Sequence, residues 1–119
     1  MKAPPRLLEI ASMRPHDIAE VLDVEAACFP TPWPRNTFHN ELTENKLAHY
    51  FVGRFDDRVV GYGGLWVILE DAHITTVAVD PRHQRKRFGE QILIRLIEEA
   101  INRGARWITL EVRESNTAA

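Results

Sequence analysis

The sequence is poor in cysteine: Cys28 is the only one in 119 residues, so no disulfide can form within the chain. That scarcity is typical of a reducing compartment, and a cytoplasmic location is therefore expected. No apolar run approaches the ~20 residues of a membrane-spanning helix and no signal-type segment follows the N-terminus, so no membrane partner is expected. The net charge of −2 gives no general attraction to nucleic acid.

Metal-ligand spacing is also missing. The five histidines do not recur at the intervals that zinc sites use, so no metal site is expected. No arrangement of histidine and acid supports Cys28 as a nucleophile, and it is expected to be a small buried hydrophobe. A content of 45% hydrophobic and 27% charged residues is ordinary for a folded protein and favours one domain covering residues 1–119.

The apolar pattern predicts the element order β-α-α-β-β-β-α-β. Three prolines between residues 30 and 34 keep the connection between the first two helices irregular. An antiparallel meander would then feed one right-handed βαβ unit, giving an α/β (α+β) fold with a mixed, mostly antiparallel sheet. Gly63 and Gly64 are expected to mark a bulge. The expected strands are 7–13, 48–55, 59–69, 74–79 and 107–112, and the expected helices begin near Pro15, Pro34 and Phe88.

The most informative segment runs from Val77 to Gly89. An apolar strand ends at Asp80-Pro81, a basic loop follows, and a helical pattern begins near Phe88. Strand, loop and helix in this order present free backbone N–H groups and a positive helix dipole to an anion. Cations on the loop suit a polyphosphate and thus a nucleotide-containing ligand. These cations are Arg82, Arg85, Lys86 and Arg87.

Val77-Ala-Val-Asp-Pro81 followed by Gln84-Arg-Lys-Arg-Phe-Gly89 resembles the acetyl-coenzyme A signature of the GNAT acetyltransferases. That signature is Gln/Arg-x-x-Gly-x-Gly/Ala between a strand and a helix. The resemblance implies a GNAT-like fold with a central βαβ acetyl-coenzyme A unit, acetyl-coenzyme A as co-substrate, and no metal. An RNA-binding patch is a weaker interpretation of the same loop, because only Phe88 interleaves with its cations.

Other segments resemble the RimI-type ribosomal-protein alanine N-acetyltransferases within that family. Residues 28–33, with Phe38 and Glu41-Leu42, are similar to the loop and helix on the acceptor side of that subfamily, and residues 110–116 are similar to its strand and turn. The implied acceptor is a protein N-terminal α-amine, with the N-terminal alanine of a ribosomal protein favoured. A lysine or small-amine acetyltransferase and a non-catalytic acyl-coenzyme A-binding module remain alternatives.

The resemblance also implies roles for individual residues. Glu111 matches the general base that takes the proton of the incoming ammonium. Val77 and Val79 would offer backbone groups to the pantetheine arm, the loop backbone would wrap the pyrophosphate, and Asn116 would bind the cofactor near the thioester. The full set implied for cofactor binding is Val77, Ala78, Val79, Arg85, Lys86, Arg87, Phe88, Gly89, Glu90 and Asn116.

Two departures from the family pattern stand out. Arg87 occupies the position of the first loop glycine, where a left-handed backbone would cost arginine roughly 1–2 kcal/mol. The family also continues past Asn116 into a helix carrying a Leu-Tyr pair and two more strands, so we expect a shortened chain or a partner that fills the gap. The tyrosine is the family's general acid, and neither Tyr50 nor Tyr62 lies in its context. The last strand would expose an edge through which the chain could dimerise.

Overall fold

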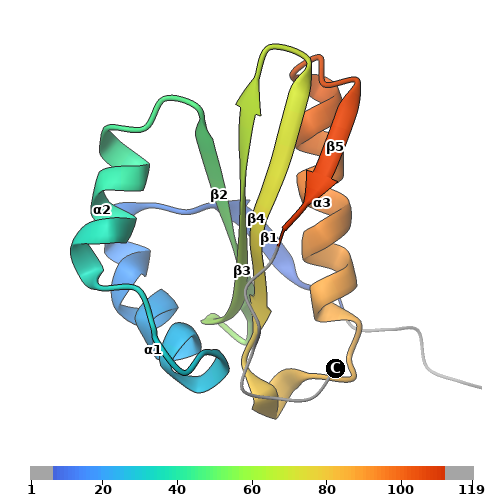
Figure 1. Ribbon diagram of the computed structural model, residues 1–119. Helices are drawn as coiled ribbons and strands as arrows, with labels where there is room; N and C mark the ends of the chain where they lie inside the picture. Colours follow the sequence, from blue (N-terminus) through green and yellow to red (C-terminus); the bar gives the residue numbers. More distant parts are fainter. Residues whose placement is uncertain (1–6, 112–119) are drawn as a thin grey trace, which may run out of the picture.

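The computed structural model describes residues 7–111 and confirms the predicted order of elements (Figure 1). Residues 7–111 form five strands, three α-helices and two 3₁₀ turns. The strands are β1 (Glu9–Ser12), β2 (Ala48–Phe55), β3 (Arg58–Ile68), β4 (Asp71–Val79) and β5 (Trp107–Leu110). The helices are α1 (Ile18–Cys28), α2 (Arg35–Thr43) and α3 (Phe88–Asn102), with 3₁₀ turns η1 (Pro15–Asp17) and η2 (Pro81–His83).

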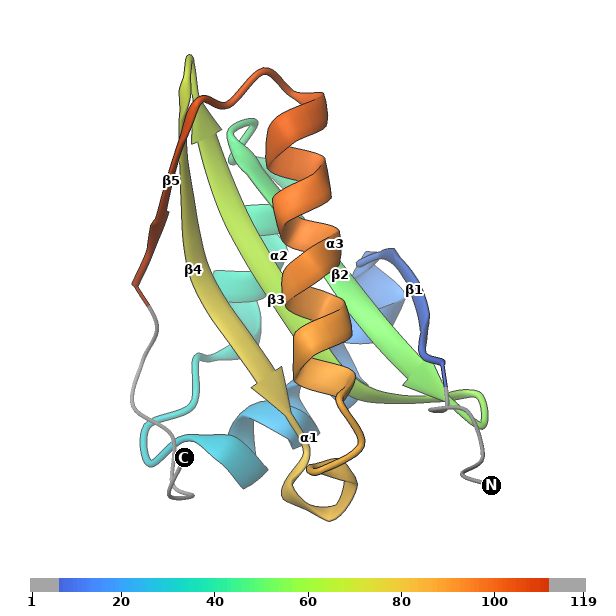
Figure 2. The same ribbon diagram turned by 90° about the vertical axis from the view of Figure 1, so that its right-hand side faces the viewer.

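One sheet runs through the molecule in the order β1-β2-β3-β4-β5. The first four strands pair antiparallel, and β4 pairs parallel with β5 from Asp71↔Trp107 to Ile74↔Leu110. Helix α3 connects these two parallel strands and crosses one face of the sheet (Figure 2). The predicted meander feeding a single βαβ unit is therefore confirmed.

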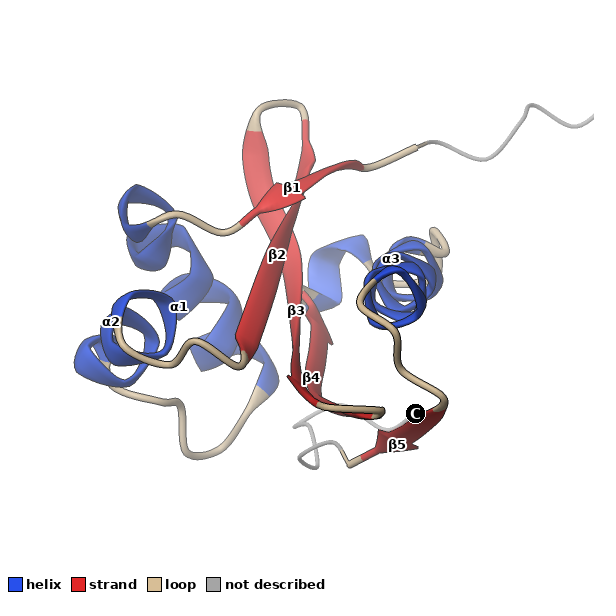
Figure 3. Ribbon diagram, turned by 90° about the horizontal axis from the view of Figure 1, so that it is seen from above, coloured by secondary structure: helices blue, strands red, loops and turns tan. Residues whose placement is uncertain are grey.

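Helices cover both faces of the sheet (Figure 3). α1 and α2 lie on one face and α3 on the other, and each side has its own cluster of buried side chains. Phe38 of α2, which is fully buried, packs against Tyr50 and Tyr62 of the sheet with ring centroids 6.5 and 5.6 Å away. None of the described helices is long and apolar enough to span a membrane.

Glycine allows α3 to lie close against β3. A Cβ on Gly61 would stand 2.9 Å from Cδ1 of Ile92 and 2.7 Å from the backbone oxygen of Ala78, closer than packed atoms allow. On the other face, a Cβ on Gly64 would lie 2.3 Å from the ring of Tyr50. The missing side chain of Gly61 therefore lets α3 pack closely on β3, and that of Gly64 makes room for the ring of Tyr50 from the neighbouring strand β2.

A bulge interrupts the pairing of β3 with β4. Gly64 pairs with Thr76 and Leu65 pairs with Ile74, so Thr75 is an extra residue on β4. The prediction of a bulge beside Gly63 and Gly64 is confirmed, although the inserted residue belongs to the neighbouring strand. The insertion reverses the side-chain alternation: Ile74 belongs to the cluster under α3, whereas Ala78, also even-numbered, belongs to the cluster under α1.

Several element boundaries differ from those predicted. β4 begins at Asp71 rather than 74, because its first residues pair with both β3 and β5. α3 ends at Asn102, and Gly104 follows with the positive φ of 90° that favours glycine. Strand β5 is described only to Leu110, and Val112 lies outside the described residues.

Candidate functional site

One edge of β4 is open over its second half. The N–H of Asp80 donates to the backbone oxygen of Val60 at 2.8 Å, which fixes the residues of β4 that bond to β3. In an antiparallel ladder the intervening residues point the other way, so the backbone groups of Val77 and Val79 face the opposite edge. Pairing with β5 stops at Ile74, and within residues 7–111 no strand follows β4 further on that side.

The end of β4 is held in place from two directions. The thiol of Cys28 donates to the backbone oxygen of Val79 at 3.1 Å, and the side-chain amide of Gln84 donates to the same oxygen at 3.3 Å. Cys28 is only 2% exposed, so the prediction that it is buried is confirmed. The carbonyl of Val79 is thus occupied by the protein, while its N–H points to the open edge.

Asp80 shapes the turn after β4. Its carboxylate accepts hydrogen bonds from the Arg82 backbone N–H at 2.9 Å and from the Arg82 guanidinium at 2.9 and 3.2 Å. These bonds hold the pKa of Asp80 below its usual value, against the opposing effect of burial. Arg82 is therefore committed to Asp80, so one of the four predicted phosphate-facing cations serves the turn instead.

The loop reaches α3 through two arginines in left-handed backbone conformation. Arg85 has φ 67° and Arg87 has φ 63°. The left-handed conformation was anticipated for Arg87, which stands where the family has glycine, but not for Arg85. Arg87 is the N-cap of α3 but makes no side-chain capping bond. The first hydrogen bond of the helix is donated by the Gln91 N–H to the carbonyl oxygen of Arg87. The N–H groups of the first helical turn, at 88–90, therefore have no acceptor within the helix.

These features meet in one cavity of about 450 Å³. It is lined by the open half of β4, the basic loop and the start of α3. Of the ten residues implied for cofactor binding, nine belong to the described part of the chain; six of these line the cavity and three do not. The lining includes Val77, Val79, Arg85, Arg87, Phe88 and Gly89, together with His83 and Gln84.

Ala78, Lys86 and Glu90 are the described candidates outside the lining. Ala78 points into the core under α1, and the side chain of Glu90 is exposed on α3. The Lys86 ammonium lies 5.2 Å from the ring centroid of Phe55 and 3.4 Å from Nδ1 of His83, so it is turned back over aromatic rings. Asn116 lies outside the described residues.

Glu111 stands where β5 separates from β4. Its N–H donates to the backbone oxygen of Ile74 at 3.0 Å, one residue before the bulge. Ala72 and Ile74 of β4 face α3, so His73 between them faces the side of α1 and α2. Thr109 pairs with His73, and because paired residues share a face of the sheet, Thr109 faces that side as well. The same alternation gives Glu111 that side, and its side chain is exposed.

Buried polar groups on the α1 and α2 side were missed from the sequence. Glu25 is fully buried and accepts hydrogen bonds from the hydroxyl of Tyr62 and from the backbone N–H of Trp33. The signal was available: Glu25 falls at the helical spacing of Ile18, Val21 and Cys28, which makes it an acid on an apolar stripe.

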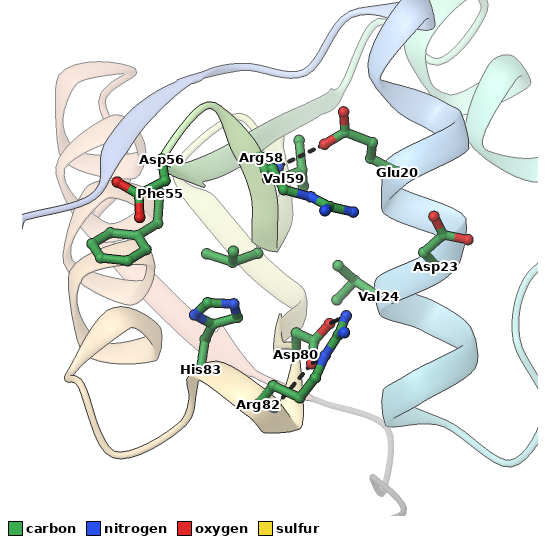
Figure 4. Close-up of a pocket in the computed structure, with 11 residues that line it drawn as sticks. Glu20, Asp23, Val24, Phe55, Asp56, Arg58, Val59, Asp80, Arg82 and His83 are labelled. Atoms are coloured by element: carbon green, nitrogen blue, oxygen red, sulfur yellow. Dashed lines mark hydrogen bonds and ion pairs between the residues drawn. The ribbon is translucent and has the colours of Figure 1, made fainter.

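A second cavity of about 310 Å³ lies between α1, the β2–β3 turn and η2 (Figure 4). Two of its acids are engaged by the protein: Glu20 accepts from the Val59 backbone N–H at 2.6 Å, and Asp80 binds Arg82. Acids outnumber cations in the lining, which does not suit a polyphosphate. Among residues 7–111, no group of three or more metal-binding side chains gathers in a site.

Comparison with known proteins agrees with this geometry. The acetyltransferase (GNAT) family matches residues 18–119. A Bacillus subtilis protein provisionally named a ribosomal protein bS18-alanine N-acetyltransferase is 38% identical over 92% of this chain and 73% of its own length. The ribosomal protein bS18-alanine N-acetyltransferase of Salmonella typhimurium is 34% identical over 87% of this chain and 68% of its own.

Solved structures share the fold. The ribosomal-protein-S18-alanine N-acetyltransferase of Escherichia coli superposes with a TM-score of 0.80 and 28% identity, covering 93% of this chain and 70% of that one. An acetyltransferase from Thermoplasma acidophilum, solved in complex with coenzyme A, has a TM-score of 0.72 at 14% identity, over 83% of this chain and 75% of that one. The matched residues, the shared fold and the cradle at the end of β4 together show that this chain belongs to the GNAT family of acetyltransferases.

Proposed function

We propose that this chain transfers an acetyl group from acetyl-coenzyme A to the N-terminal α-amine of a protein, with the N-terminal alanine of ribosomal protein bS18 as its acceptor. The cavity between the open edge of β4 and the start of α3 is the observation that carries the proposal. Along one wall it offers the backbone groups of Val77 and the N–H of Val79, which no strand within residues 7–111 pairs, and at one end it offers cations with helix N–H groups. Because a bacterial ribosomal protein is modified in the cytoplasm, the proposed reaction implies that the enzyme is cytoplasmic.

The chemistry of the cavity fits each part of coenzyme A. The backbone groups of Val77 and the N–H of Val79 can hydrogen-bond an extended pantetheine arm as a neighbouring strand would. Arg85, Arg87 and the first N–H groups of α3 suit the pyrophosphate. When bound, acetyl-coenzyme A supplies an activated thioester, and the residues of this chain orient it and manage protons.

We assign to Glu111 the role of general base, which takes a proton from the ammonium group of the acceptor. An α-amino group has a pKa of about 7.7–8.0, so near neutral pH it must lose a proton before it can attack. The position of Glu111, at the separation of β4 and β5, places an exposed carboxylate next to the open edge. A strand amide near Val79 is available to stabilise negative charge on the reacting carbonyl oxygen.

The acceptor is inferred from the relatives and from the acceptor side of the chain. Relatives that match nine-tenths of this chain carry bS18-alanine N-acetyltransferase in their names. Residues 29–34, here called the acceptor loop, lie between α1 and α2 on the face that Glu111 shares. The outer edge of β5 is exposed at Ile108 and Leu110, and pairing with a second copy through it stays a prediction.

The test is acetyl transfer to peptides followed by mass spectrometry. A peptide beginning with the N-terminal sequence of bS18 should gain one acetyl group at its α-amine. A matched peptide with a blocked N-terminus and an internal lysine should gain none. Acetylation of the lysine peptide would instead assign a lysine acceptor. Stabilisation by acetyl-coenzyme A without any transfer would favour the acyl-coenzyme A-binding module.

A further inference from the structure

Glu25 is a fully buried carboxyl group that the proposed reaction does not use. It lies in α1 among apolar neighbours and has no exposed surface. Burying such a group is unfavourable unless its oxygens are hydrogen-bonded, so the bonds it makes determine what it does in the fold. Both of its side-chain oxygens are engaged, each by a different part of the chain.

One oxygen holds the acceptor loop. Oε1 of Glu25 accepts the backbone N–H of Trp33 at 2.9 Å, across a segment that three prolines keep from forming ladder or helix bonds. The Trp33 ring then packs on Phe38 of α2 at a centroid distance of 5.3 Å. A backbone bond and a ring contact thus fix the end of the loop at Trp33.

The other oxygen connects to the strand that forms the cavity wall. Oε2 of Glu25 accepts the hydroxyl of Tyr62 on β3, and that hydroxyl lies 3.4 Å from the donating Oγ1 of Thr76. Thr76 is fully buried, directly follows the bulge residue Thr75 and directly precedes Val77. A buried polar connection therefore runs from the acceptor loop to the part of β4 that faces the cofactor cavity.

We infer that Glu25 is a positioning residue for the acceptor. It sets the position of the acceptor loop relative to the open half of β4, and so the position of the bound peptide relative to the thioester. The inference rests on the proposed function and deepens it, because it assigns Glu25 to acceptor binding rather than to cofactor binding. Glu25 does not touch the reacting atoms.

Three variants separate this role from general stability. Glu25→Met keeps a similar volume and removes both acceptors, whereas Glu25→Gln keeps one carbonyl acceptor and should retain part of the function. Asp23→Asn, on an exposed position of the same helix, removes the same charge and serves as the matched control. Should Glu25→Met fail to fold, Tyr62→Phe removes a single hydroxyl from the same connection.

Three measurements are made on each protein: hydrogen exchange of the Trp33 amide, KM for the acceptor peptide, and Kd for acetyl-coenzyme A. In Glu25→Met we expect faster exchange at Trp33 and a KM raised about tenfold, with the Kd for acetyl-coenzyme A unchanged within about twofold. Glu25→Gln should fall between this variant and the wild type. Asp23→Asn should match the wild type.

Two results would overturn the inference. Faster exchange at Trp33 with an unchanged KM would show that the loop position does not matter for the acceptor. A parallel rise in the Kd for acetyl-coenzyme A would show a general structural role. Failure of the proposed function looks different, because the wild type and Asp23→Asn would then both leave the α-amine peptide unmodified, and the inference would fail with it.

Discussion

A Cβ placed on Gly89 would lie 3.6 Å from Cγ2 of Val79, which is an ordinary van der Waals distance. Gly89 also lacks the positive φ that favours glycine. Neither packing nor backbone conformation therefore requires glycine at this helical position. Because both residues line the cavity at the end of β4, we propose that the missing side chain allows a ligand to approach closely.

Gly89→Ala should consequently separate stability from binding. The free energy of unfolding should stay the same or rise by up to about 1 kcal/mol, because alanine is the better helix former. Affinity for acetyl-coenzyme A should fall about tenfold, since a methyl group would displace the phosphate from the first helical turn. Denaturant unfolding and titration calorimetry measure the two quantities, and an unchanged affinity would show that the ligand does not approach Gly89.

Arg87 combines an unfavourable backbone with a favourable charge. Arg87→Gly should raise the free energy of unfolding by about 1 kcal/mol, because glycine adopts the left-handed conformation without strain. Both Arg87→Gly and Arg87→Ala should weaken acetyl-coenzyme A binding and reduce its dependence on salt, because a cation leaves the cavity. Tighter binding by Arg87→Gly would mean that the guanidinium does not contact phosphate.

Glu111→Gln should bind acetyl-coenzyme A like the wild type but turn over about 10²-fold more slowly at neutral pH, the usual contribution of a general base. The deficit should shrink as the pH rises above the amine pKa of about 7.7–8.0, because the amine then arrives deprotonated. Steady-state rates from pH 6.5 to 9.5 would show this. Glu98→Gln, on the exposed side of α3, is the control, and equal rates in both variants would remove Glu111 as base.

Asp80 should contribute to the stability of the fold in a pH-dependent way. Its hydrogen bonds with Arg82 hold its pKa below the ordinary value of 3.8, so the carboxylate stabilises the folded chain at higher pH. This contribution is lost as the pH falls through the depressed pKa. Asp80→Asn should therefore cost about 1–3 kcal/mol at pH 7 and progressively less in acid.

Unfolding in denaturant at a series of pH values tests the effect of Asp80. Asp71→Asn removes the same charge from the exposed start of β4, at the opposite end of the strand from Asp80, and should leave the curve unchanged. A difference between Asp80→Asn and the wild type that persists at low pH would assign the loss to packing rather than to the charged hydrogen bonds.

The sequence was sufficient for the strand order, because apolar alternation and the proline, glycine and aspartate turns are local signals. The anion cradle was likewise recognisable, since its backbone donors follow from a strand, loop and helix in series. The conformation of the individual loop cations could not be predicted from the sequence. Arg82 turned to Asp80 and Lys86 turned to Phe55, because each found a partner nearby that no spacing rule reveals.

The acceptor side was harder to predict for a different reason. The connection from Trp33 through Glu25 to Tyr62 joins residues as far as 37 positions apart, and it forms only when α1 packs on the sheet. An acid on an apolar helical stripe marks such a site, but the sequence does not say which partner satisfies it. Packing of the whole layer makes that choice.

The bulge at Thr75 sets the face that each later residue of β4 occupies. If Thr75 were paired regularly instead of forming the bulge, Val77 and Val79 would exchange faces with Thr76 and Ala78, so valine would enter the tyrosine layer and threonine would meet α3. Loss of Thr75 itself would leave a regular ladder with the later residues on their present faces, whereas a residue gained or lost after Thr75 would move side chains of β4 to the wrong core. Sequence changes in this protein should accordingly include length changes in its turns and loss of the bulge residue, whereas β4 after Thr75 should change by substitution alone.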